Sequence, residues 1–147
     1  LLGRAKADVV HCPRSHGWFG HARFDYEGLA KAGLNICLGT DSLASAGGDG
    51  ETVVLDMFAE MQEFSRNHPN LMSEDILQMA TANGAAAMRF ENELGQIKDG
   101  FMANMTMIPF DGTLSEVPEM ILQHRGPVEM LMIAGRRAFS KVGSIVD

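Results

Sequence analysis

The sequence contains no apolar run long enough to cross a membrane, and no signal-peptide pattern is visible in it. It is also poor in positive charge, with 12 lysines and arginines against 19 acidic residues and a net charge of −7 at pH 7. This deficit argues against a nucleic-acid surface and suits a soluble, cytoplasmic protein that handles a small-molecule substrate. We therefore expect neither a membrane nor a nucleic acid as a partner.

Cysteine is scarce, and the dinucleotide-binding fingerprint is missing. The two cysteines, Cys12 and Cys37, lie in apolar, strand-like runs, so we expect buried, reduced thiols rather than a disulfide or a metal pair. No G-x-G-x-x-G pattern opens a helix, which disfavours a dinucleotide-binding module. The length of 147 residues, 46% of them hydrophobic, permits one domain with a real core, or half a domain plus an appendage.

The segment 35–42 carries the clearest functional signal. A short apolar run of strand length ends at Gly39 and is followed by Thr40 and Asp41, as expected for a strand covered on both faces. Ligands and metals bind at the carboxyl ends of strands in α/β folds. Asp41 is therefore a candidate to bind a divalent metal or to take up a proton. The alternative is that Asp41 caps the next helix.

The order of the predicted elements indicates an α/β unit followed by a β appendage. We expect a strand at 8–12, a pocket-forming loop at 14–24, helices at 25–32 and 51–66, a helix capped by Ser73 and broken at 83–84, a helical turn at 85–90, a strand at 103–108, a helix at 115–124, and a hairpin of 128–133 with 137–142. This order predicts two parts, 1–90 and 91–147. Two parallel strands do not make a stable sheet alone, so partner strands are expected elsewhere.

The loop after the first predicted strand is rich in residues that shape binding pockets. Arg14 is a candidate to hold an anionic group, and the alternative is a surface salt bridge. Trp18 is a candidate to stack on a ring, or it serves only to fold the loop. The remaining substrate-binding candidates of the sequence are His11, His16, His21 and Ser42.

Histidine gives no convincing metal set. A site built from His11, His16 and His21 is disfavoured because no acidic or cysteine ligand joins them at a suitable spacing. His11 itself is equally a structural residue at a strand end. His68 and His124 stand at a turn and a helix end, so we expect both to be solvated.

Several motifs in order resemble the carboxyl-terminal half of the amidohydrolase superfamily. The motifs are His11-Cys12-Pro13-x-Ser15, Leu38-Gly39-Thr40-Asp41, Leu55-Asp56-Met57-Phe58-x-Glu60-Met61, Met79-Ala80-Thr81-x-Asn83-Gly84-Ala85 and Leu94-Gly95-x-Ile97-x-x-Gly100. The nearest branch contains cytosine and guanine deaminases, S-adenosylhomocysteine/methylthioadenosine deaminases and triazine chlorohydrolases. The longer forms of the first two motifs look most like aminodeoxyfutalosine deaminases.

The resemblance implies the carboxyl-terminal part of a distorted (β/α)8 TIM-like barrel, plus part of a flanking β-sandwich. On that pattern the strands at 8–12 and 35–39 are the seventh and eighth of the barrel. Asp41 matches the aspartate that touches a single Zn²⁺ or Fe²⁺ ion and shuttles a proton. The other ligands and the glutamate general acid of the family lie upstream of this chain. His16 replaces the asparagine usual in the HCP-x-SN form, which leaves the substrate class open.

The implied function is a metal-dependent hydrolase that deaminates a purine-, pyrimidine- or nucleoside-like substrate. Two alternatives remain: an inactive truncated module, and a chlorohydrolase of triazine-like rings. Because one ligand cannot make a catalytic metal site, we expect the chain alone to be inactive. We also expect a homo-oligomer, or a missing amino-terminal half, to cover the exposed seam of the half-barrel.

Overall fold

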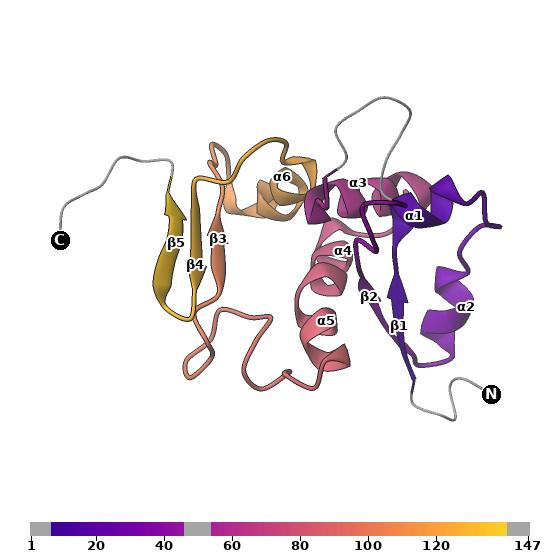
Figure 1. Cartoon of the computed structure of the whole chain (residues 1–147), viewed down its shortest axis with the longest axis horizontal. Helices are drawn as coiled ribbons and strands as arrows, with labels where there is room; N and C mark the ends of the chain where they lie inside the picture. Colours follow the sequence, from indigo (N-terminus) through magenta and orange to yellow (C-terminus); the bar gives the residue numbers. More distant parts are fainter. Residues whose placement is uncertain (1–6, 46–53, 141–147) are drawn as a thin grey trace.

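The computed structural model describes residues 7–45 and 54–140. Its elements are β1 (Asp8–His11), α1 (Pro13–Trp18), α2 (Tyr26–Lys31), β2 (Asn35–Leu38), α3 (Met57–Asn67), α4 (Ser73–Ala80), α5 (Ala82–Ala87), β3 (Met105–Met107), the 3-10 helix η2 (Leu114–Glu116), α6 (Val117–Gln123), β4 (Met130–Ile133) and β5 (Arg136–Ser140). The sheet β1–β2 lies at one end of the molecule and the sheet β3–β4–β5 at the other, with α4, α5 and α6 between them (Figure 1).

Strands β1 and β2 form the predicted parallel pair. Their register runs from Asp8 opposite Asn35 to His11 opposite Leu38. The amide of Gly39 donates a 2.9 Å hydrogen bond to the carbonyl of His11 and extends the pairing by one residue. Both strands therefore end at the same edge, where α1 begins and where Asp41 follows.

The core lies between this small sheet and three helices. It contains Ile36 and Leu38 of β2, Met61 and Phe64 of α3, Ile76 and Met79 of α4, and Leu122 of α6. Successive strand residues point to opposite faces, so Val10 lies on the face that these helices do not cover. The Val10 side chain is 60% exposed there, although its register partner Cys37 on β2 is buried.

Two predicted boundaries near the site are wrong. The segment after β1 is not a loop from its start, because α1 begins at Pro13, whose fixed φ suits the first turn of a helix. The helix expected at 51–66 begins only at Met57, since the Asp56 side chain caps it by accepting a hydrogen bond from the Phe58 amide. Residues 51–53 of that expected helix lie outside the described residues.

Two details of the following helices also differ from the prediction. Ser73 is the first residue of α4 rather than its cap, and its hydroxyl donates to Glu119. The helical conformation is interrupted at Thr81, between α4 and α5, rather than at the predicted residues 83–84. Asn83 lies inside α5. The Asn83 side chain donates a 2.8 Å hydrogen bond to the carbonyl of Ile36. It thereby pairs a carbonyl group at the open edge of β2.

The carboxyl-terminal sheet is antiparallel, and the predicted hairpin is confirmed. Strands β4 and β5 pair across Ala134 and Gly135, which both adopt positive φ angles, of 50° and 76°, as tight hairpin turns require. Strand β3 is shorter than the range 103–108. Residues 141 and 142 of the predicted last strand lie outside the described part. None of the helices in the described ranges is long and apolar enough to span a membrane.

Candidate active site

Asp41 lies in a turn directly after β2, at the edge where both parallel strands end. Its φ angle is 54°, a left-handed conformation that few residues other than glycine adopt but that aspartate tolerates. Its carboxylate oxygen Oδ2 accepts two hydrogen bonds, from Ser15 Oγ at 2.7 Å and from Ser45 Oγ at 2.8 Å. Residues 41–45 form no helix, so the capping alternative for Asp41 is not observed in the described chain.

These contacts favour the ionised form of Asp41. The hydrogen bonds from Ser15 and Ser45, with a smaller contribution from the Ser42 amide, lower the pKa of Asp41 below its ordinary value. Asp41 itself is exposed, whereas Ser15 and Ser45 are only 5% and 3% exposed. The site therefore presents a solvent-accessible, negatively charged carboxylate that accepts hydrogen bonds from two buried hydroxyl groups.

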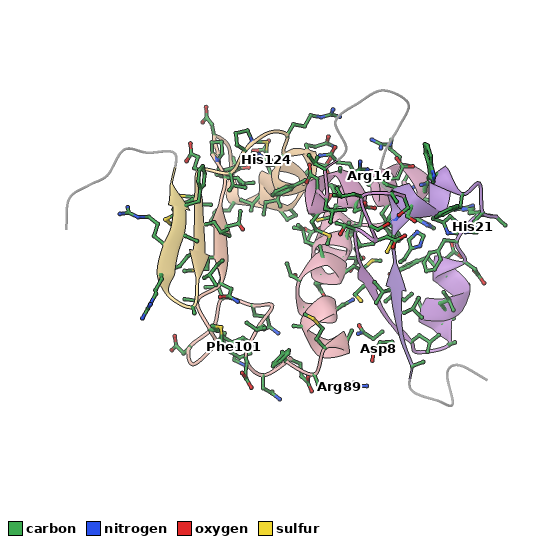
Figure 2. All side chains as sticks on the ribbon, in the orientation of Figure 1. Asp8, Arg14, His21, Arg89, Phe101 and His124 are labelled. Carbon is green, nitrogen blue, oxygen red and sulfur yellow. The ribbon has the colours of Figure 1, made fainter. Side chains whose placement is uncertain are left out.

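The position of α1, and so of Ser15, depends on a buried carboxylate of α3. The Glu60 side chain is fully buried, and its Oε2 accepts a 2.9 Å hydrogen bond from the backbone amide of Arg14. The Arg14 guanidinium donates to the carbonyl of Val54 at 3.0 Å and lies 3.8 Å from Glu60 Oε1. Burial raises the pKa of Glu60, and the contacts with Arg14 partly oppose that rise. Figure 2 shows Arg14 near α1 and α3, at the opposite end of β1 from the Asp8–Arg89 ion pair.

The three predicted pocket histidines come together, but in a cavity that Asp41 does not line. His11, His16 and His21 line a cavity of about 410 Å³ together with His68 and Phe24. The His11 ring stacks on Phe24, with ring centres 3.9 Å apart, and meets the edge of His16 at 5.0 Å. Burial and the neighbouring histidines lower the pKa of His11 to about 4, so its ring is neutral at pH 7.

His68 is buried and His124 is half-buried, whereas the sequence predicted that both are solvated. His68 is 7% exposed and stacks on Phe64 with ring centres 4.4 Å apart. Burial lowers its pKa as well. The His124 ring lies 4.8 Å from Phe58, and its buried Nε2 atom has no hydrogen-bond partner among the described residues. Phe64 stands one helical turn before His68, so that contact is local, whereas Phe58 of helix α3 is distant in sequence from His124, and a local pattern could not predict that contact.

Trp18, His21 and Ser42 are exposed, and no recorded contact joins Trp18 or His21 to Asp41 among the described residues. Ser42 belongs to the site, since it directly follows Asp41 and its Oγ lies 3.2 Å from Ser45 Oγ. The two thiols are free, as predicted, but only Cys37 is buried, whereas Cys12 is half-buried. Burial raises the pKa of both thiols.

Sequence reasoning missed the roles of Ser15, Ser45 and Glu60. A signal was present, since Ser15 stands in the first motif and Ser45 follows Asp41 by four residues. Their common acceptor becomes visible only when α1 packs beside the Asp41 turn. The described residues contain no group of three or more histidine, cysteine, aspartate or glutamate side chains that could hold a metal ion.

Comparison with known proteins places this geometry in context. A family model described as "Amidohydrolase family" matches residues 1–138. A 5-methylthioadenosine/S-adenosylhomocysteine deaminase of Pyrococcus furiosus is 36% identical over 115 residues, which cover 74% of this chain and 26% of the relative. Among solved structures, a zinc-bound adenosine deaminase from Xanthomonas campestris has a TM-score of 0.77 at 27% identity, covering 90% of this chain and 32% of that one.

A second solved structure, the aminofutalosine deaminase of Helicobacter pylori, has a TM-score of 0.76 at 28% identity. The match covers 94% of this chain and 35% of that protein. Across these comparisons the chain spans about a quarter to a third of the length of the proteins it matches.

Proposed function

We propose, from the premise that this chain belongs to the amidohydrolase family, that it supplies the carboxyl-terminal part of a metal-dependent deaminase. The substrate we propose is a purine-, pyrimidine- or nucleoside-like ring whose C–N bond is hydrolysed. The observation that carries the proposal is the ionised, accessible carboxylate of Asp41 at the carboxyl end of β2. The similarity to deaminases of adenine nucleosides supports deamination over the dechlorination of triazine-like rings.

Among the residues present, Asp41 can supply one carboxylate ligand of a Zn²⁺ or Fe²⁺ site. Asp41 Oδ2 is occupied by two hydroxyl donors, and neither of them binds Oδ1. A bound metal of this kind lowers the pKa of a water toward about 7 and so supplies the nucleophile. In our proposal Asp41 binds the metal and also accepts a proton at its carboxylate during hydrolysis.

The rest of the site lies beyond the described residues. A catalytic zinc takes about three protein ligands. The described residues offer no such group. We propose that the other ligands and the general acid come from further polypeptide, and that this contact or a homo-oligomer covers the exposed face of β1. The acidic net charge and the free thiols support a cytoplasmic protein.

The substrate-binding candidates differ in how well the geometry supports them. Trp18, His21 and Ser42 are exposed and remain candidates. His11 is buried against Phe24, which supports a structural role instead. Arg14 contacts Glu60 and Val54, so an anionic group of the substrate would compete with these partners.

The test is Asp41→Asn in the longest natural polypeptide that carries this chain, purified with its metal. We expect 5-methylthioadenosine deamination to fall by about 1,000-fold, because the amide cannot accept the proton. Asp111→Asn, in an exposed segment, is the matched control and should leave the rate unchanged. Undiminished turnover by Asp41→Asn would refute the role of Asp41.

The same preparation separates the alternatives. Turnover of a chlorotriazine without turnover of adenine nucleosides would favour the chlorohydrolase. The 147-residue chain alone should neither deaminate nucleosides nor bind one zinc ion per chain. Stoichiometric zinc together with activity in that chain would show that no further polypeptide is needed.

A further inference from the structure

Two buried serines hold the same oxygen atom of Asp41. Ser15 reaches it from α1, 26 positions earlier in the chain, and Ser45 reaches it from the turn, four positions later. We infer that Ser15 and Ser45 are positioning residues, whose hydroxyls fix Oδ2 of Asp41 and reserve Oδ1 for the metal and the transferred proton. This inference rests on the proposed function of Asp41.

An aspartate carboxylate needs such help to be held in one orientation. The torsion that rotates its two oxygens joins an sp³ carbon to an sp² carbon, and torsions of that type have broad minima. A single donor would leave the carboxylate free to turn about that contact. Two donors that approach from separate segments define the plane of the group, and both reach the same oxygen.

The two hydroxyls are placed for this contact rather than for solvent. Both serine residues are more than nine-tenths buried, and a buried hydroxyl is costly without a partner. The shortest contact of each hydroxyl that the structure records is the one to Asp41. Ser45 Oγ also lies 3.2 Å from Ser42 Oγ, so Ser42 can donate to Ser45 while Ser45 donates to Asp41. Such a chain of hydroxyls strengthens its last hydrogen bond.

The position of Ser15 depends in turn on a contact between α1 and Glu60 of α3. Glu60 accepts the Arg14 amide at the first turn of α1, one residue before Ser15. The order of contacts therefore runs from Glu60 through α1 to Ser15 and then to Asp41. A helix of six residues would not be stable alone, so this tertiary contact is what sets the hydroxyl in place.

The first measurement is the effect of removing each hydroxyl on kcat and KM in the longest natural polypeptide with its metal bound. We expect Ser15→Ala and Ser45→Ala each to lower kcat by about 10- to 100-fold while KM changes by less than about threefold. Ser15→Thr and Ser45→Thr keep a hydroxyl and should recover most of kcat. Ser73→Ala removes a serine–carboxylate bond of the same type, to Glu119, and should change neither constant.

The second measurement does not depend on turnover. Removing an outer-shell partner of a metal ligand weakens metal binding by about 10- to 100-fold. We expect that loss for Ser15→Ala and Ser45→Ala in a competition titration of zinc against a chelator, and none for Ser73→Ala. Because both hydroxyls hold one oxygen, the double variant should lose less than the product of the two single losses.

The outcomes separate this inference from the function on which it rests. If Asp41→Asn abolishes turnover but both alanine variants keep kcat and zinc affinity, the inference is overturned and the function stands. If Asp41→Asn is fully active, the function fails first. If the alanine variants have a lower melting temperature, and the threonine variants restore the melting temperature but not kcat, the serines are structural. That result also overturns the inference. If a Ser15 variant does not fold, the comparison of Ser45→Ala with Ser45→Thr tests the inference by the same criteria.

Discussion

The backbone amide of Arg14 donates a 2.9 Å hydrogen bond to Glu60, a carboxylate with no exposed side-chain surface. The other oxygen, Oε1, has no hydrogen-bond donor among the described residues and lies 3.8 Å from the Arg14 guanidinium. The charge of Arg14 therefore offsets part of the cost of burying Glu60. The contact joins α3 to α1, the helix that carries Ser15 of the candidate site.

Replacing Arg14 should destabilise the protein through Glu60. We expect Arg14→Ala to lower the free energy of unfolding by about 3 kcal/mol at pH 7, because it leaves a buried carboxylate without its counter-charge. Urea unfolding measures this loss. Lys31→Ala is the control, since it breaks an exposed ion pair with Glu27 that is worth less than about 0.5 kcal/mol. Equal losses in the two variants would contradict the role of Arg14.

The same variant should show a defined pH dependence. The pKa of Glu60 is raised in the folded protein, so the folded state binds more protons than the unfolded state above pH 4.5. Stability from this group is therefore lost as the pH rises from 4.5 through the folded-state pKa. Arg14→Ala raises that pKa further, so its deficit should be smaller at pH 5 than at pH 7. A deficit that is constant across this range would argue against a buried charge as the cause.

His11 should make the protein sensitive to acid. Its pKa is about 4 in the folded protein against 6.5 in an unfolded chain, so the unfolded state binds more protons between these values. Stability from the neutral ring is complete above pH 6.5 and is lost as the pH falls through 6.5 toward 4. The loss should not exceed about 2 kcal/mol after solvent screening.

The variant that tests this is His11→Phe, which keeps the stack on Phe24 without a titrating group. We expect a flatter profile of unfolding free energy between pH 4 and 6.5 than in the parent protein. Part of the slope should remain, because His68 also has a lowered pKa. His21→Phe, at an exposed position, is the control and should keep the full slope. An unchanged slope in His11→Phe would assign the acid sensitivity to other groups.

Local sequence signals predicted the two strands that position the site. The apolar run before Gly39 predicted β2, and the β-branched run before Pro13 predicted β1, because strand formation depends on residues that are neighbours in the chain. The placement of Asp41 after the strand followed from the same pattern. The tight turn at Ala134 and Gly135 likewise predicted the last hairpin.

The contacts that complete the site could not be predicted in this way. Helix α1 is too short for a periodic signal and depends on Glu60, which stands 46 positions after Arg14. The burial of His68 depends partly on the ring of Phe24, which stands 44 positions earlier in the chain, although Phe64 lies only one helical turn before it. Such contacts arise from packing between distant parts of the chain, which a local pattern does not encode.

Gly39 is required because β1 approaches it closely just before Asp41. A Cβ atom at Gly39 would lie 2.8 Å from Val10 Cγ1 and 3.3 Å from Cys12 Sγ. Gly39 does not adopt a positive φ angle, so this steric contact is the obstacle to a side chain there. Valine has few side-chain rotamers with which to avoid the contact. We expect Gly39→Ala to cost about 1 to 3 kcal/mol of unfolding free energy.

Removing the obstructing methyl group should restore stability. Val10 is 60% exposed, so Val10→Ala alone should cost less than about 1 kcal/mol in the described chain. The double variant Gly39→Ala with Val10→Ala should then be more stable than Gly39→Ala alone, a non-additive result typical of residues in contact. Chemical denaturation of the four proteins completes the cycle. Additive losses would mean that Cys12, whose sulfur stays in place in all four, is the group that excludes a side chain at position 39.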